Sequence, residues 1–324
     1  MEKQKHLDDN ISQIDNLVIY IIGLNRSGST LLDNILSYHE QVMSVGELHN
    51  LNGYYCKTGF GRRQNWLCSC NSEVKECSFW SKVIKDTSFS KEFITKLEDT
   101  KYYKTDILSS YFIKKNFHKN IQHTQNNLTG ETFANNTWAL YESVFRHSKK
   151  NIIIDSSKEI SEAYFINKYK KSNIKFLLIE RDIWEVVFSK RKRIANFTTE
   201  YKQKLGIKEN SIYKDILLSY KKAKQNKVIA KEILTKENAD IKVVKYSCLA
   251  KAPNEVLNEI CDFLKISSIN IPQEMGIGSR ITHTIHGSPS RYEKKKIKLD
   301  ERWREYYKKK KIALWWARIL QFFI

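Results

Sequence analysis

A continuous apolar run at residues 17–22 (LVIYII) leads directly into a loop with two glycines, and a helical pattern follows at residues 30–39. A run of this kind is typical of a strand that is buried on both faces, as strands of parallel sheets are. A strand, a glycine-containing turn and a helix in this order form the opening of a βαβ unit. The sequence therefore predicts an α/β fold built around a parallel sheet.

The same order of elements returns later in the chain. Apolar runs at residues 152–154, 174–179 and 241–246 are each followed by a helical pattern. Strands that alternate with helices predict a central parallel sheet flanked by helices on both faces. Residues 51–149 contain no comparable run and predict a mostly helical, Cys-containing insertion, whereas residues 201–235 predict a lysine-rich helix pair.

The length of the chain and its 41% hydrophobic content are sufficient for one large domain. We expect a single domain over residues 1–324. Its nucleotide-binding core would comprise residues 17–50 and 150–300, with the insertion between them and a C-terminal helix at residues 300–324.

The formal net charge of +20 favours anionic partners such as nucleotides, acidic glycans, nucleic acid or anionic lipid. An equally good explanation is a compositional background, because lysine is spread along the whole chain. The N-terminus has no apolar leader and no 18 apolar residues run together, so a cytoplasmic protein is expected. The apolar residues 312–324 are expected to pack on the protein's own core, with peripheral membrane contact through residues 308–324 as the alternative.

The loop after the first predicted strand, GLNRSGST, has the GxxxxGx[ST] frame of a P-loop. Ser29 stands where nucleoside triphosphatases have lysine, and Arg26 supplies a cation inside the loop. Backbone N–H groups of such a turn, together with the helix dipole, bind an anion. The predicted anion-binding residues are Arg26, Ser27, Gly28, Ser29, Thr30 and Leu31. The alternative is an ordinary tight turn between a strand and a helix.

A second cation, Arg181, follows the predicted strand at residues 174–179, and Ser189 comes eight residues later, two helical turns along. Ligands of open parallel sheets bind outside the carboxyl ends of the strands. Arg181 is therefore expected at the same edge as the first loop, and two anion sites there suit a nucleotide with phosphates at both ends. The alternative for Arg181 is an ion pair with Asp182 or Glu185.

These segments together resemble the sulfotransferase superfamily, especially the branch that acts on carbohydrates, tyrosine and bacterial substrates. GLNRSGSTLL is similar to its 5′-phosphosulfate loop, and RDIWEVVFS is similar to its 3′-phosphate motif. VGEL, DSSK, HTIHGSPSR and CSCNSEVKECSFW also resemble segments of that family, with Ser288 where many relatives carry Asn and Asn71 where Gly is usual. The likeness extends from about residue 17 to residue 304.

The resemblance implies a P-loop NTPase-like fold and the donor 3′-phosphoadenosine 5′-phosphosulfate (PAPS), with no metal. It implies transfer to a hydroxyl or an amine by in-line displacement, which leaves adenosine 3′,5′-bisphosphate. Arg26 would bind the 5′-phosphate and the bridging oxygen, while Arg181 and Ser189 would bind the 3′-phosphate. Arg291 resembles a residue of a late loop that closes over the nucleotide, although a solvated basic segment is an equal alternative.

Glu47 in VGEL is the predicted base, by the resemblance to the carbohydrate and tyrosine enzymes. It would act best if partial burial raised its pKa toward neutrality. The alternative is a glutamate at a helix N-terminus, and His49 is the next candidate for the base. Lys158, at the end of DSSK, is predicted either to stabilise the sulfuryl oxygens or to be a surface charge. His283 and His286 are left without a role.

Four of the six cysteines follow the spacing C-x11-C-x-C-x6-C, which lacks the paired CxxC of a zinc ribbon. Reduced thiols are expected, with a structural metal or a disulfide left open. The six are Cys56, Cys68, Cys70, Cys77, Cys248 and Cys261.

Two other functions compete with sulfuryl transfer. A P-loop kinase of small molecules would need lysine at position 29 and a carboxylate for Mg²⁺. A non-catalytic protein that binds nucleic acid or anionic membrane would account for the charge, but no nucleic-acid motif supports it. The acceptor could be a glycan, a lipid-linked sugar, a peptide tyrosine or a small alcohol, and the insertion is expected to select it.

Overall fold

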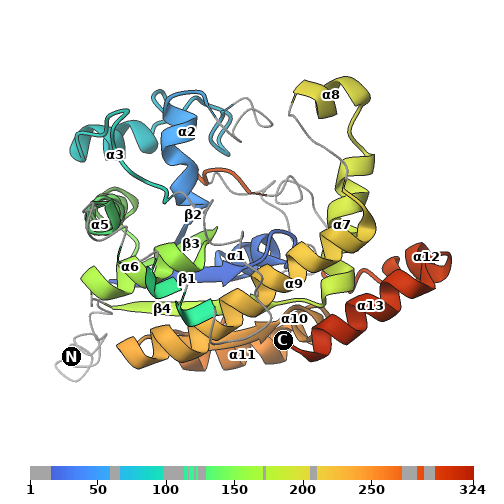
Figure 1. Cartoon of the computed structure of the whole chain (residues 1–324). Helices are drawn as coiled ribbons and strands as arrows, with labels where there is room; N and C mark the ends of the chain where they lie inside the picture. The colour runs from blue at the N-terminus through green and yellow to red at the C-terminus, as the bar shows by residue number, and fades with distance from the viewer. Residues whose placement is uncertain are drawn as a thin grey trace.

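The computed structural model describes residues 16–58, 66–97, 113–115, 117–119, 122, 129–170, 173–204, 210–271, 283–287 and 296–324. Its centre is a five-stranded sheet in the order β2-β3-β1-β4-β5, in which every neighbouring pair is parallel (Figure 1). The strands are β1 (Leu17–Gly23), β2 (Val42–Gly46), β3 (Ile152–Lys158), β4 (Ile174–Glu180) and β5 (Asp240–Lys245). The predicted α/β, P-loop-like fold is thereby confirmed.

Helices surround this sheet on both faces (Figure 1). Those before β4 are α1 (Ser29–Leu36), α2 (Leu51–Tyr55), α3 (Trp80–Asp86), α5 (Thr129–Ser148) and α6 (Ile160–Tyr169). Those after it are α7 (Ile183–Ala195), α8 (Thr199–Lys204), α9 (Ile212–Ile229), α10 (Tyr246–Lys251), α11 (Pro253–Leu264), α12 (Trp303–Lys308) and α13 (Lys311–Phe322).

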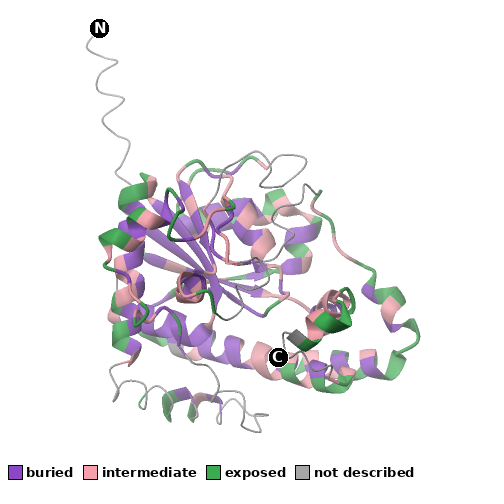
Figure 2. Ribbon diagram, turned by 90° about the horizontal axis from the view of Figure 1, so that it is seen from above, coloured by how far each residue is buried: buried purple, intermediate pink, exposed green. Residues whose placement is uncertain are grey.

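The central strand β1 shows why its sequence is apolar at every position. Its even-numbered side chains, such as Tyr20, pack in a core cluster with α5 and α6, and its odd-numbered side chains, such as Ile19, pack with α1 and α11. Successive side chains of a strand point to opposite faces, so both sets must be apolar when both faces are covered. Figure 2 shows the strands as a buried band between the helices.

Strand β3 is longer than the predicted residues 152–154, because it continues through four polar residues to Lys158. The side chains of Asp155, Ser156 and Ser157 are buried, yet they are hydrogen-bonded within the core. Asp155 accepts from the Tyr141 hydroxyl (2.7 Å) and from the backbone N–H of Ser157 (2.8 Å), and Ser156 donates to Asp33 (2.9 Å). A polar group can be buried at low cost when it keeps its hydrogen bonds.

The lysine-rich helix pair predicted for residues 201–235 is present as two helices of unequal length. The short helix α8 is followed, beyond residues outside the description, by the long helix α9, which runs on into a π-helical turn, η3 (Ala230–Leu234), and a 3₁₀ turn, η4 (Thr235–Glu237).

The predicted C-terminal helix is present as two helices, α12 and α13, which lie beside α7 and α9 (Figure 1). Helix α13 packs through Ala313, Ala317 and Leu320, as expected. Its other face exposes Ile312 and Trp315, whose exposed fractions are 71% and 63%. Among the described residues, no helix combines the length and the apolar character required to span a bilayer.

Candidate functional site

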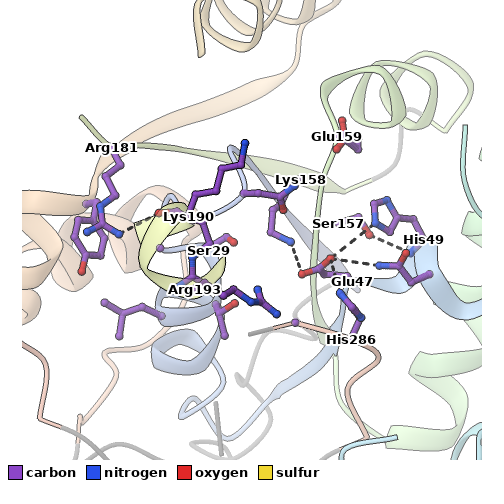
Figure 3. Close-up of a pocket in the computed structure, with 18 of the residues that line it drawn as sticks. Ser29, Glu47, His49, Ser157, Lys158, Glu159, Arg181, Lys190, Arg193 and His286 are labelled. Atoms are coloured by element: carbon purple, nitrogen blue, oxygen red, sulfur yellow. Dashed lines mark hydrogen bonds and ion pairs between the residues drawn. The ribbon is translucent and has the colours of Figure 1, made fainter. Parts of the chain in front are cut away.

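A cavity of about 530 Å³ opens at the carboxyl ends of β1, β3 and β4. Each of these strands delivers a cation to its wall: Arg26 from the loop after β1, Lys158 from the end of β3 and Arg181 from the end of β4. Figure 3 shows Arg181 at one side of the cavity and Glu47 at the other, with Lys158, Lys190 and Arg193 between them. The structure thus brings Arg26 and Arg181, the cations of the two predicted anion sites, to one cavity at this edge.

The loop between β1 and α1 is held by the conformation of Gly28. This residue has a φ of 103° and caps helix α1, and a Cβ atom added to it would lie 2.4 Å from the ring of Tyr246. Only glycine fits such a turn and such a close approach. Ser29, Thr30 and Leu31 line the cavity next to it, and the backbone N–H of Leu31 donates to the carbonyl of Gly28 (2.9 Å). N–H groups in the first turn of a helix are the ones that can bind an anion.

Ser27 differs from its prediction. Its side chain is completely buried and it is not among the residues that line the cavity. Its backbone N–H donates to the carbonyl of Leu24 (3.1 Å), so the turn itself uses the group that was expected to bind the anion. Ser27 therefore stabilises the turn of the loop and does not line the cavity.

Arg26 has a φ of 76° and donates from Nε to the hydroxyl of Ser189 (3.0 Å). Burial, and then the neighbouring Arg193 and Arg181, lower its pKa to about 10, so the guanidinium remains charged at neutral pH. Ser189 is absent from the cavity lining and meets the site through Arg26. Ser189, which was predicted to act with Arg181, therefore contacts Arg26.

Arg181 is fixed by three contacts. Its Nη1 donates to the carbonyl of Arg26 (3.0 Å), its Nε donates to Glu185 (2.9 Å), and its Cζ lies 3.9 Å from the ring centroid of Tyr246. The ion pair that was the alternative explanation is therefore present, and Arg181 still lines the cavity. A guanidinium held in this way is pre-organised to bind an anion in a fork.

Glu47 lies at the opposite side of the cavity, where four side chains surround its carboxylate (Figure 3). Lys158 Nζ is 2.5 Å from Oε1, Asn50 Nδ2 donates to Oε2 (3.3 Å), and Nε2 of His49 and Nε2 of His286 are each 4.0 Å from Oε2. Burial raises the pKa of Glu47, but Lys158, His286 and His49 together lower it further, to about 2. The condition set for a strong base, a pKa raised toward neutrality, is therefore not met, because a buried cation touches the carboxylate.

Lys158 is not the surface charge that was its alternative. It is 6% exposed, it ends strand β3 with a φ of 78°, and it lines the cavity. A non-glycine residue in this left-handed conformation is uncommon and costs on the order of 1–3 kcal/mol, and such positions gather at functional sites. The sequence could indicate Lys158 through its place at the end of a predicted strand, but it could not indicate the left-handed backbone conformation of this residue.

His286 was left without a role in the sequence, and the structure places it in the cavity. Its Nδ1 lies 3.1 Å from the Tyr54 hydroxyl, and its Nε2 faces Glu47. His49 also contacts a buried acid, because its Nδ1 lies 3.0 Å from Glu162. Nothing local distinguishes His286 in the sequence, since it approaches Glu47 only through the fold.

A backbone bridge brings the late residues 283–287 to the end of β2. Ile285 donates to the carbonyl of Val45 (2.9 Å), and Glu47 donates to the carbonyl of Ile285 (2.7 Å). Gly46, with a φ of 72°, allows this contact, because a Cβ atom there would lie 2.3 Å from the carbonyl oxygen of Ile285. Arg291, predicted to act in the same segment, lies outside the described residues.

Sequence reasoning also missed several other residues of the cavity wall, among them Lys96, Arg193 and Tyr246. Tyr246 could have been found, because it follows β5 at the same edge of the sheet as Arg181. Lys96 gives no such signal, because it lies in an irregular part of the insertion.

A second cavity, of about 410 Å³, adjoins the first and shares His49, Asn50 and Lys96 with it. Its walls come from residues 49–58 and 91–96. The Asn52 side chain donates to the carbonyls of Lys91 (2.7 Å) and Phe93 (2.8 Å), which ties the two walls together.

Three solved structures that are similar to this chain are all sulfotransferases or sulfotransferase domains. The chain is similar in structure to the sulfotransferase domain of the olefin synthase of Synechococcus PCC 7002, with 19% identity, 78% of this chain and 74% of that chain covered, and a TM-score of 0.40. It is also similar to the sulfotransferase domain from the curacin biosynthetic pathway (17% identity, 92% of each chain, TM-score 0.45). A sulfotransferase from Alicyclobacillus acidocaldarius is a third similar structure (17% identity, 80% of this chain and 83% of that chain, TM-score 0.38).

No curated protein sequence matches the chain significantly. The sequence itself matches the sulfotransferase family over residues 19–269, which is well over half of its length. The loop at Arg26, the strand end at Arg181 and the bridged segment at Glu47 all lie within that span. The chain belongs to the sulfotransferase family.

Proposed function

We propose that this sulfotransferase takes its sulfuryl group from PAPS and transfers it to a hydroxyl or an amine. The observation that carries the proposal is the contact between the two cationic strand ends. Arg181 donates to the backbone carbonyl of Arg26, and both side chains line one cavity. A nucleoside with phosphates at both its 3′ and 5′ positions offers one anionic group to each arginine.

Phosphoryl transfer from ATP fits the same cavity less well. Ser29 stands where P-loop enzymes have the lysine that bridges the β- and γ-phosphates, so this contact to ATP would be missing. The charge at the end of β4 is also cationic, through Arg181, where a Mg²⁺ site would need a carboxylate.

In the proposed reaction the acceptor oxygen attacks sulfur while the bond from sulfur to the 5′-phosphate oxygen breaks. The electron pair of that bond passes to the leaving oxygen, where Arg26 would stabilise the developing charge. The acceptor proton passes to Glu47. Because sulfuryl transfer makes demands similar to those of phosphoryl transfer, positioning and electrostatics would supply most of the rate.

The ion pair of Glu47 with Lys158 gives this step a physical order. With a pKa of about 2, the carboxylate is ionised but is a weak base. An anionic sulfuryl group in the cavity would compete with Glu47 for the ammonium of Lys158. As that contact weakens, the pKa of Glu47 would rise, because burial by itself raises it.

The second cavity is the proposed entrance for the acceptor. It meets the first cavity at His49 and Asn50, next to Glu47, and its walls belong to the insertion at residues 51–149. The walls are largely apolar, with Phe93 and Ile94, and they also carry the amide of Asn52 and the hydroxyls of Thr58 and Thr95. These polar groups suit a hydroxylated acceptor: a glycan, a lipid-linked sugar or a small molecule.

Peripheral membrane contact through residues 308–324 stays a proposal that would suit a lipid-linked acceptor. The exposed face of α13 carries Ile312, Trp315 and Phe322 close to the lysines at 308–311. An apolar face beside cations is typical of helices that lie in an anionic bilayer surface. Co-sedimentation with anionic vesicles is expected for the whole chain and should be lost in a variant with Ile312→Ser and Trp315→Ser. Equal sedimentation of both proteins would contradict it.

Thermal unfolding in the presence of nucleotides tests the donor. Adenosine 3′,5′-bisphosphate at a hundred times its Kd should stabilise the protein by about 2.7 kcal/mol, whereas ATP should have a smaller effect. Arg181→Gln should weaken the binding of the bisphosphate by about 1.5–3 kcal/mol, the usual value of hydrogen bonds to a charged group. Arg302→Gln, on an exposed side chain paired with Asp300, is the control. Stabilisation by ATP alone would support the kinase instead.

A further inference from the structure

Three cysteines that are close together in the sequence meet one distant histidine at a point outside the cavity. Sγ of Cys77 is 3.6 Å from Sγ of Cys70, 3.8 Å from Sγ of Cys68 and 3.2 Å from Nδ1 of His283. All four ligand atoms lie within 4.8 Å of one another. The fourth residue, His283, comes from the late segment that also carries Ile285 and is 206 positions from Cys77.

These distances match those of a tetrahedral zinc site. Zinc lies about 2.3 Å from a thiolate sulfur and about 2.0–2.1 Å from an imidazole nitrogen. A tetrahedron with these bond lengths separates two sulfurs by about 3.8 Å and a sulfur from a nitrogen by about 3.6 Å. The separations around Cys77 and the 3.9 Å between Cys68 Sγ and His283 Nδ1 scatter about these values.

The surroundings hold the four side chains in this arrangement. The backbone N–H of Trp80 points to Sγ of Cys77 (3.5 Å), and its indole N–H donates to the carbonyl of His283 (2.5 Å). The ring of Phe79 stacks on His283, with 5.2 Å between centroids and 17° between planes. Outer contacts that orient the ligands are a regular feature of metal sites.

We propose that Cys68, Cys70, Cys77 and His283 bind one Zn²⁺ ion. Three thiolates with one imidazole select zinc over the hard cations Mg²⁺ and Ca²⁺, which prefer oxygen ligands. Four protein ligands leave no open position, so the ion is structural and takes no part in sulfuryl transfer. This departs from the expectation that the chain needs no metal, which concerned the transfer reaction.

Cys56, the first cysteine of the spacing C-x11-C-x-C-x6-C, is not part of the site. Its Sγ lies 3.3 Å from the side-chain oxygen of Asn52, to which it donates. The sequence pattern therefore suggested four cysteines, and the structure replaces the first of them with a histidine. Because the fourth ligand is a distant histidine, the spacing of the cysteines fitted no familiar zinc motif.

The ion would join two distant parts of the chain beside the catalytic pocket. Next to the ligands, the N–H of Ser69 donates to the carbonyl of Thr284 (3.2 Å), and the N–H of Thr284 donates to the hydroxyl of Ser69 (2.9 Å). The residues that follow, Ile285 and His286, contact the backbone and the side chain of Glu47. The zinc site would thus act as a positioning element for the proposed base.

The test is the zinc content of the whole purified chain, measured by elemental analysis after exhaustive dialysis against metal-free buffer. One zinc per chain is expected for the native protein and for Cys56→Ser, the matched control. Cys70→Ser and His283→Ala should retain at least tenfold less. Zinc below one tenth per chain in the folded native protein, or equal zinc in all four proteins, would overturn the proposal.

A second measurement protects the test from variants that fail to fold. Native protein stripped with a chelator and reloaded with Co²⁺ should show the thiolate-to-cobalt charge-transfer bands and the intense visible bands of a tetrahedral site. Titration of free thiols tests the remaining alternative, which is a disulfide. A disulfide among the three cysteines would leave two thiols fewer than the six of the sequence and no metal, and that result would contradict the zinc site.

Discussion

The ammonium of Lys158 lies 2.5 Å from the carboxylate of Glu47, and both side chains are almost completely buried. This pair connects the end of β3 with the end of β2 across the floor of the cavity. It explains how a buried glutamate can have a pKa of about 2, although burial acts in the opposite direction. The pair therefore keeps the proposed base, Glu47, ionised before substrate binds.

Replacement of the cation gives the first prediction. Lys158→Met removes the strongest influence that lowers the pKa of Glu47, so burial should raise that pKa above about 2 and toward or beyond 4.5. The acid limb of the pH profile of kcat/KM should therefore move to higher pH in this variant.

Glu47→Gln should lower kcat by about 10²–10⁴-fold, with binding of adenosine 3′,5′-bisphosphate nearly unchanged. An unchanged kcat in Glu47→Gln would exclude Glu47 as the base.

Arg26 is predicted to act in the transition state more than in binding. Arg26→Ala should cost about 2.7–4 kcal/mol of transition-state stabilisation, which is the usual cost of losing a donor aimed at developing charge. The measurement is kcat/KM with PAPS and any acceptor that is turned over. Arg304→Ala, on an exposed side chain paired with Glu301, is the control. Turnover near the native rate in Arg26→Ala would show that this guanidinium does not touch the leaving oxygen.

Much of this site could be predicted because its residues lie at strand ends. Arg26, Lys158 and Arg181 each follow a continuous apolar run, and the carboxyl ends of parallel strands share one edge. The length and polarity of the surrounding pattern were sufficient to identify four of the five strands. Strand β2 was missed because it has five residues with Ser44 among them, and it becomes a strand only by pairing with β3.

The unpredicted parts of the site depend on contacts between distant residues. His286 meets Glu47, and His283 meets Cys77, only because the late segment bridges to β2. No spacing along the chain records such a meeting. The depressed pKa of Glu47 was unpredictable for the same reason, since Lys158 follows it by more than a hundred positions.

Asp155 should make stability depend on pH. Burial raises its pKa from 3.8 to about 6, although hydrogen bonds from Ser157 and Tyr141 oppose the rise. The folded state therefore binds more protons than the unfolded state between about pH 4 and pH 6, so ionised Asp155 lowers the free energy of unfolding as the pH rises through this window. The difference between the two pKa values corresponds to about 3 kcal/mol at most.

Asp155→Asn checks this sign. The amide can accept from Ser157 through its oxygen and donate to the Tyr141 hydroxyl, so the hydrogen bonds can be kept. The variant should lose the decrease between pH 4 and pH 6 and should match or exceed native stability at pH 7, by denaturant unfolding at each pH. Parallel pH profiles for both proteins would refute the raised pKa.

Gly46→Ala should damage the bridge between β2 and the late segment. The added methyl group would lie 2.3 Å from the carbonyl oxygen of Ile285, and alanine is strained at a φ of 72°. The strain alone should cost about 1–3 kcal/mol of unfolding free energy. Thermal unfolding measures this loss, and a variant as stable as the native protein would show that the bridge contributes little.

Removal of the proposed zinc should loosen the same bridge without unfolding the sheet. The backbone amides of Glu47 and Ile285, which are hydrogen-bonded across the bridge, should then exchange with solvent deuterium faster. Amides of β1, such as that of Ile19, are the internal control because they lie in the centre of the sheet. Equal exchange of the Glu47 amide with and without chelator would show that the metal does not stabilise the bridge beside the pocket.

The bridge at Ile285 also has a consequence for biosynthesis. Glu47 leaves the ribosome early, whereas the segment that completes its surroundings is made about 240 residues later. At roughly 5–20 residues per second, the nascent pocket would stay unfinished for on the order of 10–50 s. Chains truncated before residue 283 are therefore expected to be inert, which would keep incomplete polypeptides from consuming donor.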